Sequence, residues 1–390
     1  MSVQISYKKQ IIFFMMLIVI FAISVEIILQ VIDSFPKQCH LRESKLFDKF
    51  SEHEKQVLCE EYNKMAGEVS YNLAPVRLHI PNQHGVYVNI NSDGFRGGEI
   101  IFSENQYKIF FLGGSTAFGS LSSSDETTIP GYVEKKLLDK GYDVKIVNGG
   151  IHSATTIDEF YMLENYFLKF KPDMVIMYDG YNAAGDFNLR KFHISYDEFK
   201  NNYAQLNNIP FNGVKVTSVK GTGIINFLEQ SNYKTGIGLV IFYKNMLNPN
   251  PINTKETTAN PKITNFIENY MTENWSKTCS LGEKNGFKTV NFIQPILGTG
   301  DRTISENEMK IMNKDWFKNH YLTYLKSINI DVKKVEPCEN IFDLRNSFSG
   351  MNGVDIYWDE GHMTDFGNEI IAEKITEKLI PIINNDLIES

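Results

Sequence analysis

The chain presents a serine in a setting that suits a nucleophile. Ser115 follows two glycines, Gly113 and Gly114, which in turn follow the apolar run from Ile109 to Leu112. The run predicts a buried strand, and the glycines predict a sharp turn after it. Open α/β sheets place their chemistry at the carboxyl ends of such strands, and a short helix after the turn would direct backbone N–H groups at negative charge. Ser115 is therefore a candidate nucleophile, with an ordinary strand-to-helix turn as the alternative.

Two kinds of phosphate-binding loop are excluded at this turn. A Walker A loop requires a lysine directly after its last glycine, and no lysine follows Gly119. The dinucleotide-binding fingerprint requires G-x-G-x-x-G, which the order Gly113-Gly114-Ser115 breaks. The choice that remains for Ser115 is between a nucleophile and a structural turn.

Three further segments carry groups suited to acyl transfer. Asp359 precedes His362 by three residues, a spacing that lets the carboxylate accept from one ring nitrogen while the other faces Ser115. Gly150 and Asn182 follow two other apolar runs and could donate a backbone N–H and a side-chain amide to an oxyanion. Each segment alone has a structural explanation as a turn or a helix cap. Together they supply a nucleophile, a base, an orienting acid and oxyanion donors.

The elements that must position these groups alternate along the chain. Short apolar strands alternate with amphipathic helices, which predicts βαβ units, a parallel sheet and helices on both faces. The expected strands are 109–112, 143–148, 173–178, 287–295 and 328–335, and the expected helices are 130–140, 155–170, 304–327 and 364–380. We therefore predict an α/β fold: a three-layer α/β/α sandwich with a parallel, flavodoxin-like five-stranded sheet.

The sequence resembles the SGNH (GDSL-type) hydrolase superfamily in four blocks. GGSTAFG, NGG, DGYN and DEGHMTDFGN stand in the family's order and near its spacing, within residues 107–182 and 287–380. The resemblance implies that Ser115 is the nucleophile and a first oxyanion donor, that Gly150 and Asn182 are the second and third donors, and that His362 is the base with Asp359 behind it. The implied activity is that of a serine esterase that works through an acyl-enzyme, without a metal or a cofactor.

The chain departs from the family's pattern at two positions. The family's Gly-Asp-Ser becomes Gly113-Gly114-Ser115, which removes a carboxylate beside the nucleophile. The family's Asn-Asp pair becomes Asn182-Ala183, which keeps the amide donor and loses a neighbour that helps to hold its loop. Neither change removes a catalytic group, so activity is still expected. What the departures affect is the positioning of Asn182.

The chain order Ser, Asp, His also fits the α/β-hydrolase fold, whose serine stands in G-x-S-x-G. Ala117 occupies the position of the second glycine, and the closeness of Asp359 to His362 favours the SGNH interpretation. Three function classes stay open. The first is an esterase acting on acyl esters of envelope glycans or lipids. The second is an O-acyltransferase modifying surface polysaccharide, in which a sugar hydroxyl replaces water, and the third is an inactive binding protein on the same fold.

The N-terminus carries an apolar run of membrane-spanning length. Residues 11–32 are interrupted only by Glu26 and Gln30, while Lys8 and Lys9 precede the run. The positive charge predicts a cytoplasmic N-terminus and an extracytoplasmic remainder. The alternatives are a cleaved signal peptide, for which no small-x-small site is evident, and a buried core helix. We therefore expect a single-pass anchor in the cell membrane.

The four cysteines fit an oxidising compartment. They show no CxxC spacing and no nearby histidine pair, so disulfides are favoured over a zinc site. Three pairings are compatible with the sequence; we predict Cys39 with Cys59 and Cys279 with Cys338. The alternative is four buried free thiols.

Composition and organisation limit the partners. The chain has 390 residues, 42% of them hydrophobic, and a net charge of -8, and it has no basic stripe, which argues against a nucleic-acid partner. We expect an anchor over 1–33, a juxtamembrane segment and edge strand over 34–100, and a hydrolase domain over 101–385. An aromatic-rich insertion at about 183–286 is expected to form a lid or substrate wall, with a structural excursion as the alternative.

Overall fold

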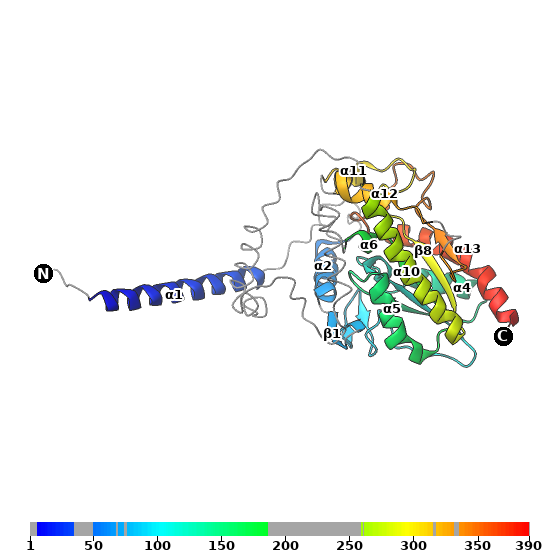
Figure 1. Ribbon diagram of the computed structural model, residues 1–390, viewed down its shortest axis with the longest axis horizontal. Helices are drawn as coiled ribbons and strands as arrows, with labels where there is room; N and C mark the ends of the chain where they lie inside the picture. Colours follow the sequence, from blue (N-terminus) through cyan, green and yellow to red (C-terminus); the bar gives the residue numbers. More distant parts are fainter. Residues whose placement is uncertain are drawn as a thin grey trace. The chain divides into compact units, whose positions relative to one another are not determined.

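A computed structural model of the chain describes residues 6–34, 50–67, 69–73, 76–185, 259, 261–314, 317–330 and 335–389. The chain divides into two compact units, Met1–Gln38 with Val214–Ile252, and Cys39–Gly213 with Asn253–Ser390. In the first unit the described element is helix α1 (Tyr7–Ser34) (Figure 1). The second unit contains all the other elements described below, including every predicted site residue.

The second unit is built on a parallel sheet of five strands. In spatial order they are β6 (Val144–Gly150), β5 (Tyr107–Gly113), β7 (Met174–Asp179), β8 (Lys288–Ile293) and β9 (Ile341–Asp343). All four neighbouring pairs are parallel. In chain order the arrangement reads 2-1-3-4-5, the order of flavodoxin-like sheets, and so the predicted fold class is confirmed.

The fifth strand is not where the sequence predicts it. Residues 328–330 form no strand, and 331–334 lie outside the described residues. The sheet is completed instead by Ile341–Asp343, whose Ile341 pairs with Asn291 of β8. A strand of three residues is too short to show the alternation of apolar and polar side chains by which strands are predicted.

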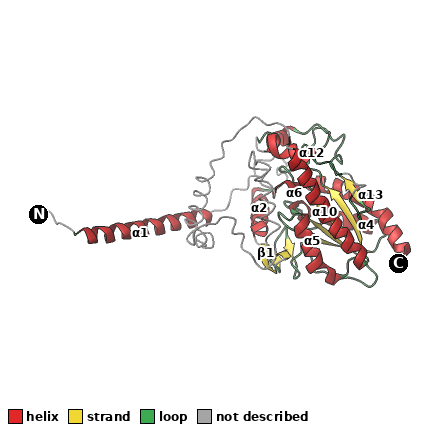
Figure 2. Ribbon diagram, viewed as in Figure 1, coloured by secondary structure: helices red, strands yellow, loops and turns green. Residues whose placement is uncertain are grey.

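Helices cover both faces of the sheet, as predicted. Helices α5 (Thr156–Asn165) and α10 (Pro261–Asn285) pack together on one face, and α4 (Ile129–Asp139) and α13 (Asp365–Glu389) on the other (Figures 1 and 2). The predicted insertion at 183–286 included α10, yet α10 packs on α5 and β8 as the helix that connects β7 with β8. Residues 186–258 of that insertion, with the expected lid, lie outside the described residues.

Two predicted helices are divided in the structure. The first is α5, which is followed by a 3₁₀ turn at Phe167–Phe170. The second, expected over 304–327, consists of α11 (Glu306–Met312), a π-helical turn (Phe317–Tyr321) and α12 (Leu322–Ser327). Helix α11 begins at a capping box in which Ser305 and Glu308 satisfy each other's backbone N–H groups, so its start has a local cause.

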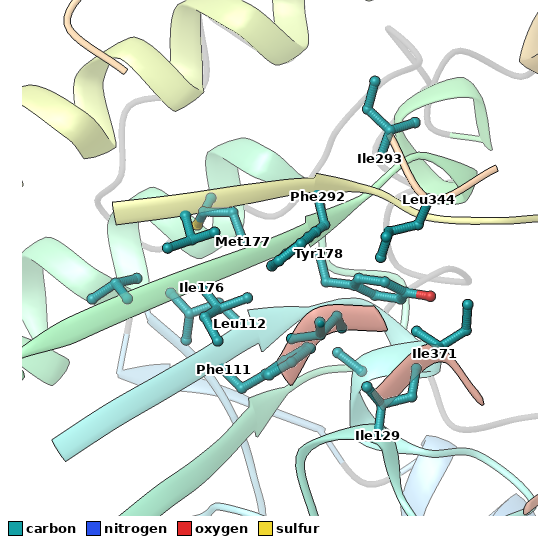
Figure 3. Close-up of a cluster of buried hydrophobic side chains, with 14 of the residues drawn as sticks. Phe111, Leu112, Ile129, Ile176, Met177, Tyr178, Phe292, Ile293, Leu344 and Ile371 are labelled. Carbon is teal, nitrogen blue, oxygen red and sulfur yellow. The ribbon is translucent and has the colours of Figure 1, made fainter. Parts of the chain in front are cut away.

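The core on the α4 and α13 face contains side chains from neighbouring strands of the sheet. Figure 3 shows Phe111, Tyr178 and Phe292 from three neighbouring strands beside Ile129 and Ile371 of the covering helices. The rings of Phe111 and Tyr178 lie 5.8 Å apart between centroids. All of these side chains are buried. Replacing one of the aromatic residues by alanine is therefore expected to lower the free energy of unfolding by about 3–5 kcal/mol.

The segment before β5 adds a helix and short strands to the second unit. It contains α2 (Glu52–Gly67), the antiparallel pair β1 (Val69–Leu73) and β2 (Val76–His79), and the pair β3 (Gln83–His84) and β4 (Asn89–Ile90). Arg96 forms an antiparallel bridge with Asn148, so this segment contacts the edge strand β6 of the main sheet.

Cys279 of α10 and Cys338 form a disulfide with a sequence separation of 59 residues, as predicted. Cys59 is also disulfide-bonded. Its predicted partner, Cys39, lies outside the described residues.

Helix α1 is long and apolar enough to cross a membrane. Residues Tyr7–Ile27 have a mean hydropathy of 2.5, and almost all of their side chains are exposed. A membrane span and an N-terminal signal sequence both have this length and composition. The structure therefore supports an apolar N-terminal helix of membrane-spanning length.

Candidate active site

Ser115 opens a short helix just after β5, an interior strand of the sheet. Helix α3 (Ser115–Phe118) is preceded by Gly114 in an extended conformation. The Asn182 side chain approaches the turn closely, and its Nδ2 occupies the space beside Gly114 that a Cβ would otherwise enter. A Cβ at Gly113 would lie 2.9 Å from the Tyr178 carbonyl oxygen. The two glycines thus allow the carboxyl ends of strands β5 and β7 to lie close together at Ser115.

Asp359 and His362 lie on one tight turn. The Trp358 N–H donates to the His362 carbonyl oxygen at 2.8 Å, which closes the turn. Inside it, Asp359 Oδ1 accepts from the backbone N–H groups of Gly361 at 2.9 Å and of His362 at 2.7 Å. Asp359 Oδ2 lies 2.7 Å from His362 Nδ1. The carboxylate therefore holds both the backbone and the ring of the histidine three residues later.

The other ring nitrogen of His362 reaches Ser115. Nε2 lies 2.7 Å from Ser115 Oγ, across a sequence separation of 247 residues. An ionised carboxylate can only accept a hydrogen bond, so the contact with Asp359 places the ring proton on Nδ1. Nε2 then has to accept from the Ser115 hydroxyl. This is the arrangement in which an imidazole can remove a proton from serine.

The charge state of Asp359 suits this arrangement. Burial alone would raise the pKa of Asp359, but the charge and hydrogen bonds of His362, with the N–H of Gly361, lower that pKa to about 2. The carboxylate is therefore ionised throughout the neutral range and can stabilise an imidazolium.

Asn182 lies beside the turn, in helix α6 (Tyr181–Gly185) after β7. Its Nδ2 donates to the Ala154 carbonyl oxygen at 2.8 Å, which leaves the second amide hydrogen for another acceptor. The hydroxyl of Tyr321 donates to the carbonyl oxygen of Tyr181, the residue before Asn182. These contacts position the amide although the family's neighbouring aspartate is replaced by Ala183.

A buried carboxyl pair supports the strand end that leads to Asn182. Asp179 Oδ2 accepts from Trp275 Nε1 at 2.8 Å. Burial raises the pKa of Asp179 to about 6, while the hydrogen bonds from Trp275 and Glu159 oppose that rise. Burial, together with the charge of Asp179, raises the pKa of Glu159 well above its usual value. Burial therefore favours the neutral form of Glu159 beside Asp179.

Gly150, the remaining predicted donor, ends strand β6. Its N–H donates to Asn148 Oδ1 at 3.1 Å, and a Cβ at Gly150 would lie 2.1 Å from the backbone nitrogen of Phe118. The N–H therefore has an acceptor in its own loop, and donation from Gly150 to an oxyanion stays a prediction.

Two residues with no role in the sequence analysis hold the end of helix α3. Arg96 is buried, and its Nη1 donates to the carbonyl oxygens of Phe118 at 3.1 Å and Gly119 at 2.5 Å. Its Nε pairs with Asp125 at 2.8 Å. Asn148 Nδ2 also donates to the Phe118 carbonyl oxygen, at 3.2 Å. An arginine far from the motif in sequence carries no local signal of such a contact.

Among the described residues, no group of three or more His, Cys, Asp or Glu side chains is arranged to hold a metal ion.

Comparison with known proteins identifies one family and several solved structures of low sequence identity. The family model described as GDSL-like Lipase/Acylhydrolase matches residues 109–375. No curated protein matches the chain. Similar solved structures include the acetyl xylan esterase AlAXEase, with 14% identity, 69% of this chain and 97% of that chain covered, and a TM-score of 0.34. A catalytic mutant of Axe2, an acetylxylan esterase from Geobacillus stearothermophilus, has 13% identity, 70% and 93% coverage, and a TM-score of 0.36. A putative lipolytic protein of the G-D-S-L family from Desulfitobacterium hafniense has 14% identity, 70% and 99% coverage, and a TM-score of 0.31.

Proposed function

The chain belongs to the GDSL-like lipase/acylhydrolase family and is an SGNH-type serine esterase, and we propose that Ser115, His362 and Asp359 are its catalytic triad. The observation that carries this assignment is the pair of 2.7 Å contacts that His362 makes, one with Ser115 Oγ and one with Asp359 Oδ2. The base is thereby in hydrogen-bond reach of both the nucleophile and the orienting acid.

The reaction follows from these contacts. Ser115 Oγ attacks the carbonyl carbon of an ester while its proton passes to His362 Nε2. The tetrahedral intermediate collapses, the alcohol leaves with the proton from His362, and the acyl group stays on Ser115 Oγ. Water then attacks the acyl-enzyme while one of its protons passes to His362 Nε2. The second tetrahedral intermediate collapses, His362 returns that proton to Ser115 Oγ, and the acid is released. Asp359 stays ionised and stabilises the imidazolium in both steps.

The oxyanion is proposed to bind between the N–H of Ser115, the Asn182 amide and the N–H of Gly150. Ser115 stands at the first position of a helix, where the backbone N–H has no partner within the helix. Asn182 Nδ2 is close enough to Gly114 to exclude a Cβ there. Gly150 would have to exchange its hydrogen bond with Asn148 for the oxyanion.

Replacing Asn182 tests this oxyanion assignment. Asn182→Asp has the same shape but presents acceptors, and Asn182→Ala presents neither donor nor acceptor. Both are expected to lower kcat about 10²- to 10³-fold in steady-state ester hydrolysis, with a smaller change in KM, because the donor acts on charge that develops in the transition state. Asn165→Ala is a matched control, since the Asn165 amide donates to the Tyr161 carbonyl oxygen on the far end of α5. A kcat that falls equally in the control and in Asn182→Ala would contradict the assignment.

We further propose that the enzyme is held in the cell membrane by helix α1, with the catalytic unit outside the cytoplasm. The apolar length of α1, the lysines before it and the disulfide between Cys279 and Cys338 support this location. Acyl esters of envelope glycans or lipids are the substrates that such a location makes accessible. Finding a mature protein that lacks residues 1–33 would replace the anchor by a cleaved signal sequence.

Two experiments separate the esterase from the other function classes. A fluorophosphonate probe is expected to label Ser115 in the folded full-length chain; failure to label it would favour an inactive binding protein. Esters of short and long acyl chains are then offered with and without a competing sugar hydroxyl. Release of free acid at an unchanged rate supports the esterase, whereas acyl transfer to the sugar supports the O-acyltransferase, which uses the same serine and histidine.

A further inference from the structure

Helix α2 lies before the matched family region, which begins at residue 109, yet it packs on the turn that carries Asp359 and His362. Leu58 of α2 is fully buried in a cluster with Leu121 and Trp358. Trp358 directly precedes Asp359. The helix therefore rests on the residue that begins the catalytic turn.

The position of α2 is fixed by its Glu61. The Glu61 carboxylate accepts from the backbone N–H groups of Val86 at 2.6 Å, Tyr87 at 2.8 Å and Val88 at 3.2 Å. A Cβ at Gly85 would lie 2.4 Å from Glu61 Oε2, so this approach requires glycine. A carboxylate that accepts three backbone hydrogen bonds determines where the neighbouring side chains of the helix point.

Tyr62, the next residue on α2, lies between two imidazole rings. Its ring centroid is 6.4 Å from that of His362, with the planes at 71°, and 5.6 Å from that of His152. The first contact is edge-to-face, which is a favourable geometry for aromatic pairs. Burial, the largest effect, and the charge of Asp359 together raise the pKa of Tyr62 to about 12, so the hydroxyl stays neutral.

The second ring neighbour of Tyr62, His152, is joined to the segment after the nucleophile. Ser120 Oγ lies 2.8 Å from His152 Nε2. Ser120 follows the nucleophile helix α3, and its N–H donates to the Ser115 carbonyl oxygen at 3.0 Å. Tyr62 thus connects α2 with the segments that carry both Ser115 and His362.

We propose that Tyr62 is a positioning residue for His362, supplied by a helix that precedes the hydrolase domain. The catalytic imidazole must keep Nδ1 on Asp359 and Nε2 on Ser115 at the same time, and a flat ring packed at its side opposes rotation of the imidazole away from both. The inference rests on the proposed triad. Because small displacements of reacting groups reduce rates strongly, loss of this support acts on kcat.

Three variants of the full-length chain test the proposal. Tyr62→Leu fills similar apolar space without a flat ring, and is expected to lower kcat about 10- to 100-fold with KM changed less than about threefold. Tyr62→Phe keeps the ring and is expected to retain kcat within about threefold. Tyr87→Leu is the matched control, because Tyr87 packs against the same Leu58 cluster and its backbone makes the contacts with Glu61 and Arg96. Tyr62→Ala serves as a second variant should Tyr62→Leu not fold.

The measurements are kcat, KM, the melting temperature and the rate of labelling by a fluorophosphonate probe. The proposal is supported if kcat and labelling fall in Tyr62→Leu, return in Tyr62→Phe and are unchanged in Tyr87→Leu at a similar melting temperature. It is overturned if Tyr62→Leu keeps its kcat, or if Tyr87→Leu loses as much. Failure of the parent protein to react with the probe would instead refute the proposed function.

Discussion

Ser115→Ala is expected to reduce kcat for ester hydrolysis by about 10⁴- to 10⁶-fold, the largest effect of any single substitution in this protein. The substitution removes the only atom that forms the acyl-enzyme and leaves the turn intact. The backbone holds that turn, because the Ser115 carbonyl oxygen accepts from the N–H groups of Gly119 and Ser120, both at 3.0 Å. The melting temperature should therefore change little while turnover and probe labelling are lost.

A double variant sharpens this prediction. Ser115 and His362 act as one unit, so Ser115→Ala with His362→Ala should be no slower than Ser115→Ala alone. Ser103→Ala, an exposed serine in the loop before β5, is the control for the substitution itself. Hydrolysis of p-nitrophenyl acetate by Ser115→Ala at the parent rate would refute the nucleophile, and multiplication of the two losses would show that the residues act independently.

Asp359→Asn is expected to lower kcat about 10³- to 10⁴-fold. Asparagine can still accept from the N–H groups of Gly361 and His362, so the turn is kept. Its amide, however, can donate to His362 Nδ1 and so select the tautomer with the proton on Nε2. In that tautomer Nε2 cannot accept from Ser115. A folded Asp359→Asn variant that keeps more than a tenth of the parent kcat at pH 7 would contradict the role of Asp359.

The lowered pKa of Asp359 also predicts that the stability of the fold depends on pH. The pKa of Asp359 is lowered from 3.8 to about 2 in the folded chain, so the ionised carboxylate stabilises the fold above its unfolded value. This contribution is lost as the pH falls from about 4 towards 2. The advantage in melting temperature of the parent over Asp359→Asn should therefore shrink as the pH falls through that window. A difference that grows on acidification would mean that the carboxylate is protonated more readily in the folded state.

The sequence predicted the strands and helices that alternate regularly along the chain. Strands β5, β6, β7 and β8 are apolar runs separated by amphipathic helices, and such runs identify buried parallel strands. Strand β9 was misplaced because its three residues are defined by pairing with β8 and not by their own pattern. Helix α10 falls within the predicted insertion because a long segment separates it from β7. Its own sequence does not reveal that it connects β7 with β8.

The predicted site residues differ in how far their contacts were visible in the sequence. The contact between Asp359 and His362 lies within one turn, so the spacing of two residue types was enough to suggest it. The close approach of Asn182 to Gly114 could not be inferred from either motif. The acceptor of the Gly150 N–H is the side chain of Asn148, two residues earlier, which the NGG block contains but does not reveal.

By itself, the amino-acid sequence determined the α/β class, the apolar N-terminal helix and the turn that joins Asp359 to His362. These depend on backbone preferences, on burial of periodic apolar residues and on hydrogen bonds between close neighbours. Only the tertiary structure decided that Arg96 holds the end of the nucleophile helix and that Tyr62 lies against His362. Such contacts join segments whose separation along the chain is unrelated to any period, so they depend on how all the intervening elements pack.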